Sequence, residues 1–135
     1  MSSGVDELRV VLTVEDFQSS LSVLRDVLGM EVVAQFDDGG GPVVLLSAGR
    51  ATIELSDRAH SDHIDGLEVG RTVPVPVRLA VHVPDTETAT AALIAAGLTL
   101  LGPPAATPWG SINSRVVGPA GVQLTLFDGV EDDDA

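Results

Sequence analysis

Few residues in this chain can do chemistry, which narrows the reactions open to it. The 135 residues include no cysteine, lysine or tyrosine. This composition excludes thiolate nucleophiles, cysteine-ligated metals, Schiff-base lysines and tyrosine acids. Three histidines, seven arginines, the carboxylates and the hydroxyls remain. Any chemistry must therefore come from charged side chains and imidazoles.

Three charged residues have the spacing to meet on one face of a sheet. Arg9, Glu54 and Arg78 each alternate with apolar neighbours in a segment that reads as a strand. On a functional interpretation, one arginine neutralises Glu54 and the other offers a forked donor to a ligand carbonyl, phenolate or carboxylate. The structural alternative is an ion-pair cluster that fixes how two halves of the protein pack. The two roles are compatible.

Other candidate ligand-binding residues follow from the same alternation or from a loop position. His82 shares a face with Arg78, and either takes part in proton transfer or only lines a pocket. Trp109 either stacks on a planar ligand or plugs the end of the sheet. Asn113 points inward only if the phase of its strand holds, since a one-residue slip reverses it. The candidate set is Arg9, Thr13, Glu54, Arg78, His82, Trp109, Asn113 and Thr125.

His60 and His63 lie three residues apart among several aspartates, a pattern that suggests a metal site. A polar segment with histidines at this spacing is more often solvated, and no fourth ligand is fixed by the spacing. The sequence therefore predicts no metal at these histidines.

An internal repeat indicates which elements position these residues. Segments Leu8–Gly29 and Val77–Gly97 both read as an alternating strand, an aspartate suited to a helix N-cap, a helical apolar pattern and a closing glycine. The N-cap aspartates Asp16 and Asp85 are 69 residues apart, as are Arg9 and Arg78. A repeat with strand, cap and stop in register favours two copies of one structural unit.

The remainder of each copy reads as three strands. The candidates are Met30–Gln35, Pro42–Ser47, Ala51–Leu55, Thr99–Leu101, Ile112–Val117 and Val122–Phe127. The prediction is an α+β fold: two tandem βαβββ modules forming a curved eight-stranded mixed sheet with a concave cleft and helices on its convex side. The single domain spans 1–128, with modules at about 7–55 and 77–128. The linker 56–76 is expected to hold a short helix near Asp62–Leu67.

Net charge and hydropathy limit which partners and which cellular location are expected. The formal net charge of −13 repels phosphate backbones, so nucleic acid is not expected as a partner, and it suits cationic ligands. Residues 129–135 are interpreted as an acidic, disordered tail. No apolar run is long enough to span a membrane, and the N-terminus lacks the pattern of a signal peptide, so a cytoplasmic location is expected.

Four short motifs occur in order along the chain. They are the Val14-Glu15-Asp16 junction, the LRDVLG segment Leu24–Gly29, the TPWG segment Thr107–Gly110 and the GPAGVQLTLF segment Gly118–Phe127. Together they resemble the vicinal oxygen chelate superfamily, which includes glyoxalases, bleomycin-resistance proteins and extradiol dioxygenases; the second and fourth motifs are similar to the family's FYRDVLG and DPxGNxxEL. The resemblance covers roughly Leu8 to Asp128. The family hosts many chemistries, so the resemblance implies the fold more strongly than an activity.

The resemblance also places the family's four metal-ligand positions at Arg9, Glu54, Arg78 and Thr125. Only Glu54 is a good ligand, because arginine has no lone pair to donate and keeps its charge. The expectation is a site without metal or cofactor.

The function expected from this resemblance is metal-independent binding of an aromatic or drug-like small molecule, in a protein that forms a homodimer, as members of the family often do. The alternatives are a lyase, isomerase or dioxygenase of the same superfamily that uses Glu54 with or without a metal, and a structural or regulatory module with a filled cleft. Whether the protein is an enzyme is left open.

Overall fold

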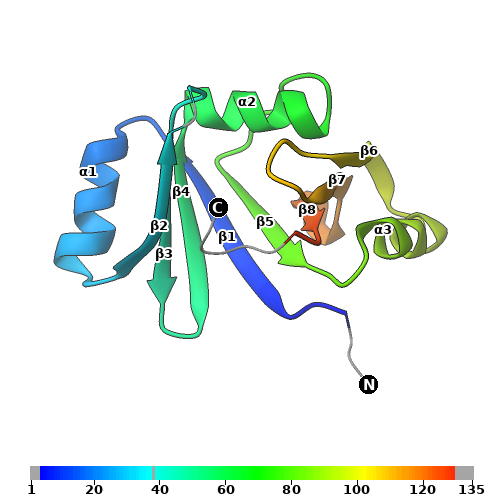
Figure 1. Ribbon diagram of the computed structural model, residues 1–135, viewed down its shortest axis with the longest axis horizontal. Coiled ribbons are helices and arrows are strands. Elements are labelled where there is room, and N and C mark those ends of the chain that lie inside the picture. The colour runs from blue at the N-terminus through cyan, green and yellow to red at the C-terminus, as the bar shows by residue number, and fades with distance from the viewer. Residues whose placement is uncertain (1–3, 38, 130–135) are drawn as a thin grey trace.

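Eight strands form one mixed sheet in the order β2-β3-β4-β1-β5-β8-β7-β6 (Figure 1). The computed structural model describes residues 4–37 and 39–129. The strands are β1 (Glu7–Val14), β2 (Glu31–Asp37), β3 (Pro42–Ala48), β4 (Ala51–Asp57), β5 (Val77–His82), β6 (Thr99–Ala106), β7 (Ile112–Val117) and β8 (Gln123–Phe127). The helices are α1 (Phe17–Leu21), α2 (Arg58–Glu68) and α3 (Thr86–Ala95), with a π-helical segment η1 (Ser22–Val27) and a 3-10 turn η2 (Pro119–Gly121).

The two modules have the same topology. β1 pairs in parallel with β4, and β5 pairs in parallel with β8. At the centre of the sheet β1 and β5 pair antiparallel, with Arg9 opposite Ala80 and Val11 opposite Arg78. This junction joins the modules into one sheet. The predicted α+β fold with two βαβββ modules and an eight-stranded mixed sheet is confirmed.

The two aspartates predicted to cap helices do so. Asp16 accepts a hydrogen bond from the backbone N–H of Ser19, and Asp85 accepts from those of Glu87 and Thr88. Because a helix leaves its first N–H groups without partners, these caps set where α1 and α3 begin.

The strand alternation correctly separates the two faces of the sheet. Apolar residues of one parity pack under α1 and α3, which lie on the outer flanks of the sheet (Figure 1). Leu55 and Leu126 are almost fully buried in the two resulting cores. Side chains of the other parity, including Arg9 and Arg78, face the opposite, concave side.

The linker helix and β6 are longer than predicted. α2 covers Arg58–Glu68 instead of a short turn near Asp62–Leu67, and Asp57 caps it by accepting from the N–H of His60 at 2.9 Å. In Figure 1 it runs across the top of the view, above the central strands β1 and β5. β6 extends to Ala106 through two irregularities in its pairing with β7. Pro103 and Pro104, which read as loop residues, fall within this irregular edge strand.

None of the helices within the described ranges is long and apolar enough to cross a membrane. The acidic tail, apart from Gly129, lies outside the described residues.

Asp128 fastens the end of β8 to neighbouring elements. Its carboxylate accepts hydrogen bonds from the backbone N–H groups of Thr86 (3.1 Å) and Ile112 (3.0 Å). Burial alone would raise the pKa of Asp128, but these bonds outweigh burial and hold the pKa below its ordinary value of 3.8. The ionised carboxylate therefore stabilises the fold where α3, β7 and β8 meet.

Asp128→Asn is expected to lower the free energy of unfolding by about 1 kcal/mol at pH 7, a low figure because the carboxyl is partly exposed. Since the pKa is lower in the folded state, the stabilisation is present above pH 3.8 and is lost as the pH falls through the folded value. The difference in unfolding free energy between the native protein and Asp128→Asn should therefore shrink on acidification. Urea unfolding at pH 7 and pH 3 measures it, and an equal gap at both values would contradict this role.

Candidate functional site

A cavity of about 320 Å³ lies between the concave face of the sheet and α2. Its walls come from β1–β5, from β7 and β8, from α2 and from the loop that carries Trp109. α2 contributes His60, Ile64 and Glu68, so this helix forms one wall of the cleft. The volume is at the lower end of the range for small-molecule sites in proteins.

The apolar part of the wall is rich in aromatic rings. The whole chain has four aromatic residues, three phenylalanines and one tryptophan. Three of them, Phe36, Trp109 and Phe127, line this cavity. Phe127 is buried, whereas Trp109 is 46 % exposed, which places its ring where the cavity meets solvent. Flat rings on several sides favour a planar guest.

Arg9 and Glu54 form the first of two charged groups in the wall. The Nη1 of Arg9 lies 3.6 Å from a carboxylate oxygen of Glu54, and its Nε donates to Glu7 at 2.7 Å. The guanidinium carbon also lies 5.2 Å from the centre of the Phe127 ring. Arg9 therefore has carboxylate partners and an aromatic face, and it neutralises Glu54 in the way that the sequence suggested.

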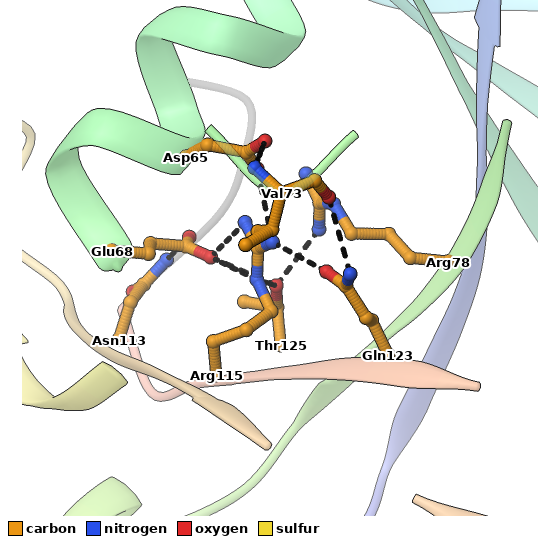
Figure 2. Close-up of polar contacts among 8 residues, drawn as sticks. All are labelled: Asp65, Glu68, Val73, Arg78, Asn113, Arg115, Gln123 and Thr125. Carbon is orange, nitrogen blue, oxygen red and sulfur yellow. Dashed lines mark hydrogen bonds and ion pairs between the residues drawn. The ribbon is translucent and has the colours of Figure 1, made fainter. Parts of the chain in front are cut away.

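The second charged group is a buried cluster centred on Arg115, which has no exposed surface (Figure 2). The guanidinium donates to Glu68 from Nε (3.0 Å) and Nη2 (2.8 Å), and to Asp65 from Nη1 (2.9 Å). Both carboxylates come from α2, three residues apart on its inner face. A forked arginine between two buried carboxylates ties α2 to β7.

Polar residues complete this cluster. Thr125 donates its hydroxyl proton to Glu68 and accepts from Arg115, while Asn113 donates to the other oxygen of Glu68 at 2.8 Å. Gln123 accepts from Arg115 and donates to the carbonyl of Val73, in the segment after α2. Each buried carboxylate oxygen thus has a donor, as burial of a charge requires.

Arg78 stands at the edge of this cluster and faces the cavity. It is 7 % exposed, and its Nη1 donates to the hydroxyl of Thr125 at 2.8 Å. Figure 2 shows it reaching Thr125 from the side opposite Glu68. Within the described ranges it makes no ion pair with a carboxylate.

The structure brings together six of the eight predicted site residues. Those that line the cavity are Arg9, Glu54, Arg78, Trp109, Asn113 and Thr125. Asn113 is buried and tied to Glu68, so the strand phase on which its inward orientation depended is correct. Whether these residues contact a ligand stays a prediction.

The other two predicted residues, Thr13 and His82, do not line this cavity. His82 bonds Asp6 through Nδ1 (2.7 Å) and the carbonyl of Gly129 through Nε2 (3.0 Å). The rings of His82 and Phe127 pack edge to face with their centroids 5.2 Å apart, so His82 lies next to that wall residue. Thr13 lies near the end of β1, where its N–H bonds the carbonyl of Pro76. Correct parity along a strand therefore did not ensure a place in the cavity.

Sequence reasoning missed the contributions of α2 and β2. His60, predicted to be solvated, is 8 % exposed and lines the cavity, as do Glu68 and Phe36. The available signal was a helical one: His60, Ile64 and Glu68 recur at four-residue spacing and therefore share a face of α2. Two of the three are polar, and this concealed the face. A carboxylate is seldom buried without a partner, and the partner of Glu68 is far away in the sequence.

The four family positions for a metal do not suit one here. Arg9 and Arg78 are cations without donor lone pairs, and the hydroxyl of Thr125 is engaged by Glu68, Arg78 and Arg115. Glu54 alone is an ordinary ligand. Within the described ranges, no group of three or more histidine, aspartate or glutamate side chains is placed to hold an ion. No function through a metal is derived for this site.

Several solved structures have the same fold. A hypothetical protein from Bacillus halodurans C-125 aligns with a TM-score of 0.70 at 16 % identity, covering 99 % of this chain and 100 % of that one. Methylmalonyl-CoA epimerase from Mycobacterium tuberculosis aligns at 0.67 and 20 % identity, covering 97 % and 93 %. A glyoxalase/bleomycin resistance protein/dioxygenase superfamily member from Vibrio splendidus 12B01 aligns at 0.65 and 18 % identity, covering 91 % and 98 %.

At these identities the likeness shows a shared fold alone. No curated protein matches the sequence at a significant level. The sequence itself matches a family over residues 8–126, nearly the whole of both modules. The chain belongs to the Glyoxalase/Bleomycin resistance protein/Dioxygenase superfamily.

Proposed function

We propose that this protein binds a small aromatic molecule in the cavity between its sheet and α2, without a metal. One observation carries the proposal: three of the four aromatic residues of the chain line a single cavity of about 320 Å³. Apolar walls with a few placed polar groups are typical of small-molecule sites. The cavity suits a guest of about two rings.

The chain offers a convenient probe of this function. Trp109 is its only tryptophan and there is no tyrosine, so fluorescence excited at 295 nm reports on the cavity mouth alone. Biphenyl-4-carboxamide, a neutral two-ring compound, is expected to change this fluorescence in a saturable way. The same compound should raise the melting temperature, since it binds the folded state.

Ala80→Leu tests whether the guest enters the cavity. Ala80 lies in the wall on β5 and is 5 % exposed, so a larger side chain there fills space that the guest would need. We expect the affinity for biphenyl-4-carboxamide to fall at least about tenfold, the loss that 1.4 kcal/mol of displaced contact produces. Fluorescence titration and calorimetry measure it.

The matched control is Ala92→Leu, the same change at an exposed position of α3 outside the cavity. It should bind like the native protein. Equal affinity of the native and Ala80→Leu proteins would place the guest elsewhere, and no binding by the native protein would overturn the proposed function.

The alternative from the sequence is a lyase, isomerase or dioxygenase reaction at Glu54. Glu54 is in the wall and its side chain is 17 % exposed, so it can face a guest, but its carboxylate lies 3.6 Å from the guanidinium of Arg9, which a reacting group would have to displace or share. Recovery of the probe unchanged after prolonged incubation supports binding alone. A new product that disappears with Glu54→Gln supports the enzyme.

A cytoplasmic location and a homodimer are part of the same proposal. On the convex face, Leu8 of β1 and Val77 of β5 are each 45 % exposed, which leaves apolar surface on the central strands. A second copy of the chain would cover this surface, and light scattering measures the oligomeric state.

A further inference from the structure

We infer that the natural ligand carries a carboxylate and that Arg78 is the group that binds it. This inference rests on the proposed function and adds the chemical class of the ligand. The overall charge of −13 favours cationic ligands, so the inference departs from what the composition suggests. The protein as a whole is acidic, but the wall of the cavity contains a positive charge, that of Arg78, which makes no ion pair with a carboxylate among the described residues.

The first argument is hydrogen bonding. A guanidinium has five N–H donors, and burial without acceptors is costly for each of them. Arg78 is 7 % exposed, yet the one hydrogen bond that its guanidinium makes to protein within the described ranges is to the hydroxyl of Thr125 at 2.8 Å. Among the described residues its remaining nitrogen atoms are neither bonded to protein nor enclosed by it, and the side chain lines the cavity. An acceptor-rich group in the cavity would satisfy them.

The second argument is the pairing of charges in the wall. Four charged residues line the cavity: Arg9, Glu54, Glu68 and Arg78. Arg9 and Glu54 pair with each other, and Glu68 pairs with Arg115 outside the wall. Arg78 is the one member of this set without a carboxylate within 4.0 Å among the described residues.

A structural role as counter-charge leaves most of the donors of Arg78 unused. Asp65 and Glu68 together carry one more charge than Arg115 can balance. Their four carboxylate oxygens nevertheless already accept hydrogen bonds, from Arg115, Thr125, Asn113 and the N–H of Val73. Thr125 stands between Arg78 and Glu68 (Figure 2). The fork of Arg78 is therefore directed to the cavity, and a fork of this geometry matches a carboxylate with two parallel hydrogen bonds.

The position of Arg78 also orients the ligand. β5 holds Arg78 and Ala80 in the floor, while Trp109 stands 46 % exposed at the mouth. An aryl carboxylate would place its charged end on Arg78 and its rings among Phe36, Phe127 and Trp109.

The test compares biphenyl-4-carboxylate with biphenyl-4-carboxamide, which has the same shape and no charge, by calorimetry on the full chain. We expect the native protein to bind the carboxylate at least about tenfold more tightly, as a charge-assisted pair implies. Arg78→Met should weaken the carboxylate by a similar factor and the carboxamide less than about threefold. Arg78→Lys, which keeps the charge but not the fork, should restore part of the preference.

Arg50→Met is the control, because Arg50 is exposed in the turn between β3 and β4, and both affinities should stay at native values. The inference is overturned if the native protein binds both probes equally, a result that needs no variant to fold, or if Arg78→Met weakens both alike. In either case binding itself, and with it the proposed function, still stands. If neither probe binds, both proposals fail.

Discussion

Arg115→Met is expected to lower the free energy of unfolding by about 3–5 kcal/mol, a large share of what a domain of this size has. The side chain removed is fully buried, and methionine of similar length leaves Asp65 and Glu68 charged and unmatched. The loss of one partner of a buried ion pair costs more than the pair contributes, because the other charge stays desolvated. Urea unfolding followed by circular dichroism measures the change.

Arg25→Met is the matched control. Arg25 also forms an ion pair, with Asp26 at 2.9 Å, but both side chains are about half exposed. Solvent screens such pairs, so this substitution should leave the unfolding free energy nearly unchanged. Arg115→Lys, which keeps the charge without the fork, should fall between the native protein and Arg115→Met. Equal stability of Arg115→Met and the native protein would contradict the role assigned to the cluster.

The sheet and its faces could be predicted from the sequence because they depend on local patterns. Strand alternation placed Arg9, Glu54 and Arg78 on one face, and the repeat placed Asp16 and Asp85 at equivalent helix starts. A period of two residues needs no knowledge of distant parts of the chain. The same is true of the family motifs, which each span a few consecutive residues.

The position of α2 as a wall of the cavity could not be predicted in the same way. Glu68 and Arg115 are 47 residues apart, and the burial of Glu68 makes sense only when Arg115 is beside it. A hydrophobic pattern would have revealed a buried helix face, whereas carboxylates on that face read as solvated. The prediction for His60 was wrong for this reason.

His82 shows the limit of alternation within a strand. It has the same parity as Arg78, but it lies at the end of β5, where Asp6 and Gly129 bind both of its ring nitrogens. Parity gives the face of the sheet, and the position along the strand decides whether the cavity reaches a residue. The curvature that sets this reach depends on the packing of the whole sheet.

Gly102→Ala is expected to destabilise the protein by about 3 kcal/mol and to weaken ligand binding, although it adds only one methyl group. Gly102 is buried on β6, where the end of α2 crosses the strand. A Cβ here would overlap the carbonyl oxygen of Glu68 and lie 2.8 Å from its carbonyl carbon and 3.1 Å from the Cα of Val69. These are backbone atoms, so α2 itself must move, and with it the carboxylate that Arg115 and Asn113 hold.

Gly66→Ala provides the contrast, because Gly66 lies in the exposed part of α2 with open space around its Cβ position. Alanine favours a helix over glycine, so this variant should gain about 0.5–1 kcal/mol. The two changes differ in sign because a methyl group at Gly102 meets the backbone of α2, whereas one at Gly66 meets nothing and only favours the helix. Unfolding measurements on both variants, with titration of biphenyl-4-carboxamide, test that contact. Native stability in Gly102→Ala would show that α2 is not seated on β6, and the cavity would then lack the wall that gives it its shape.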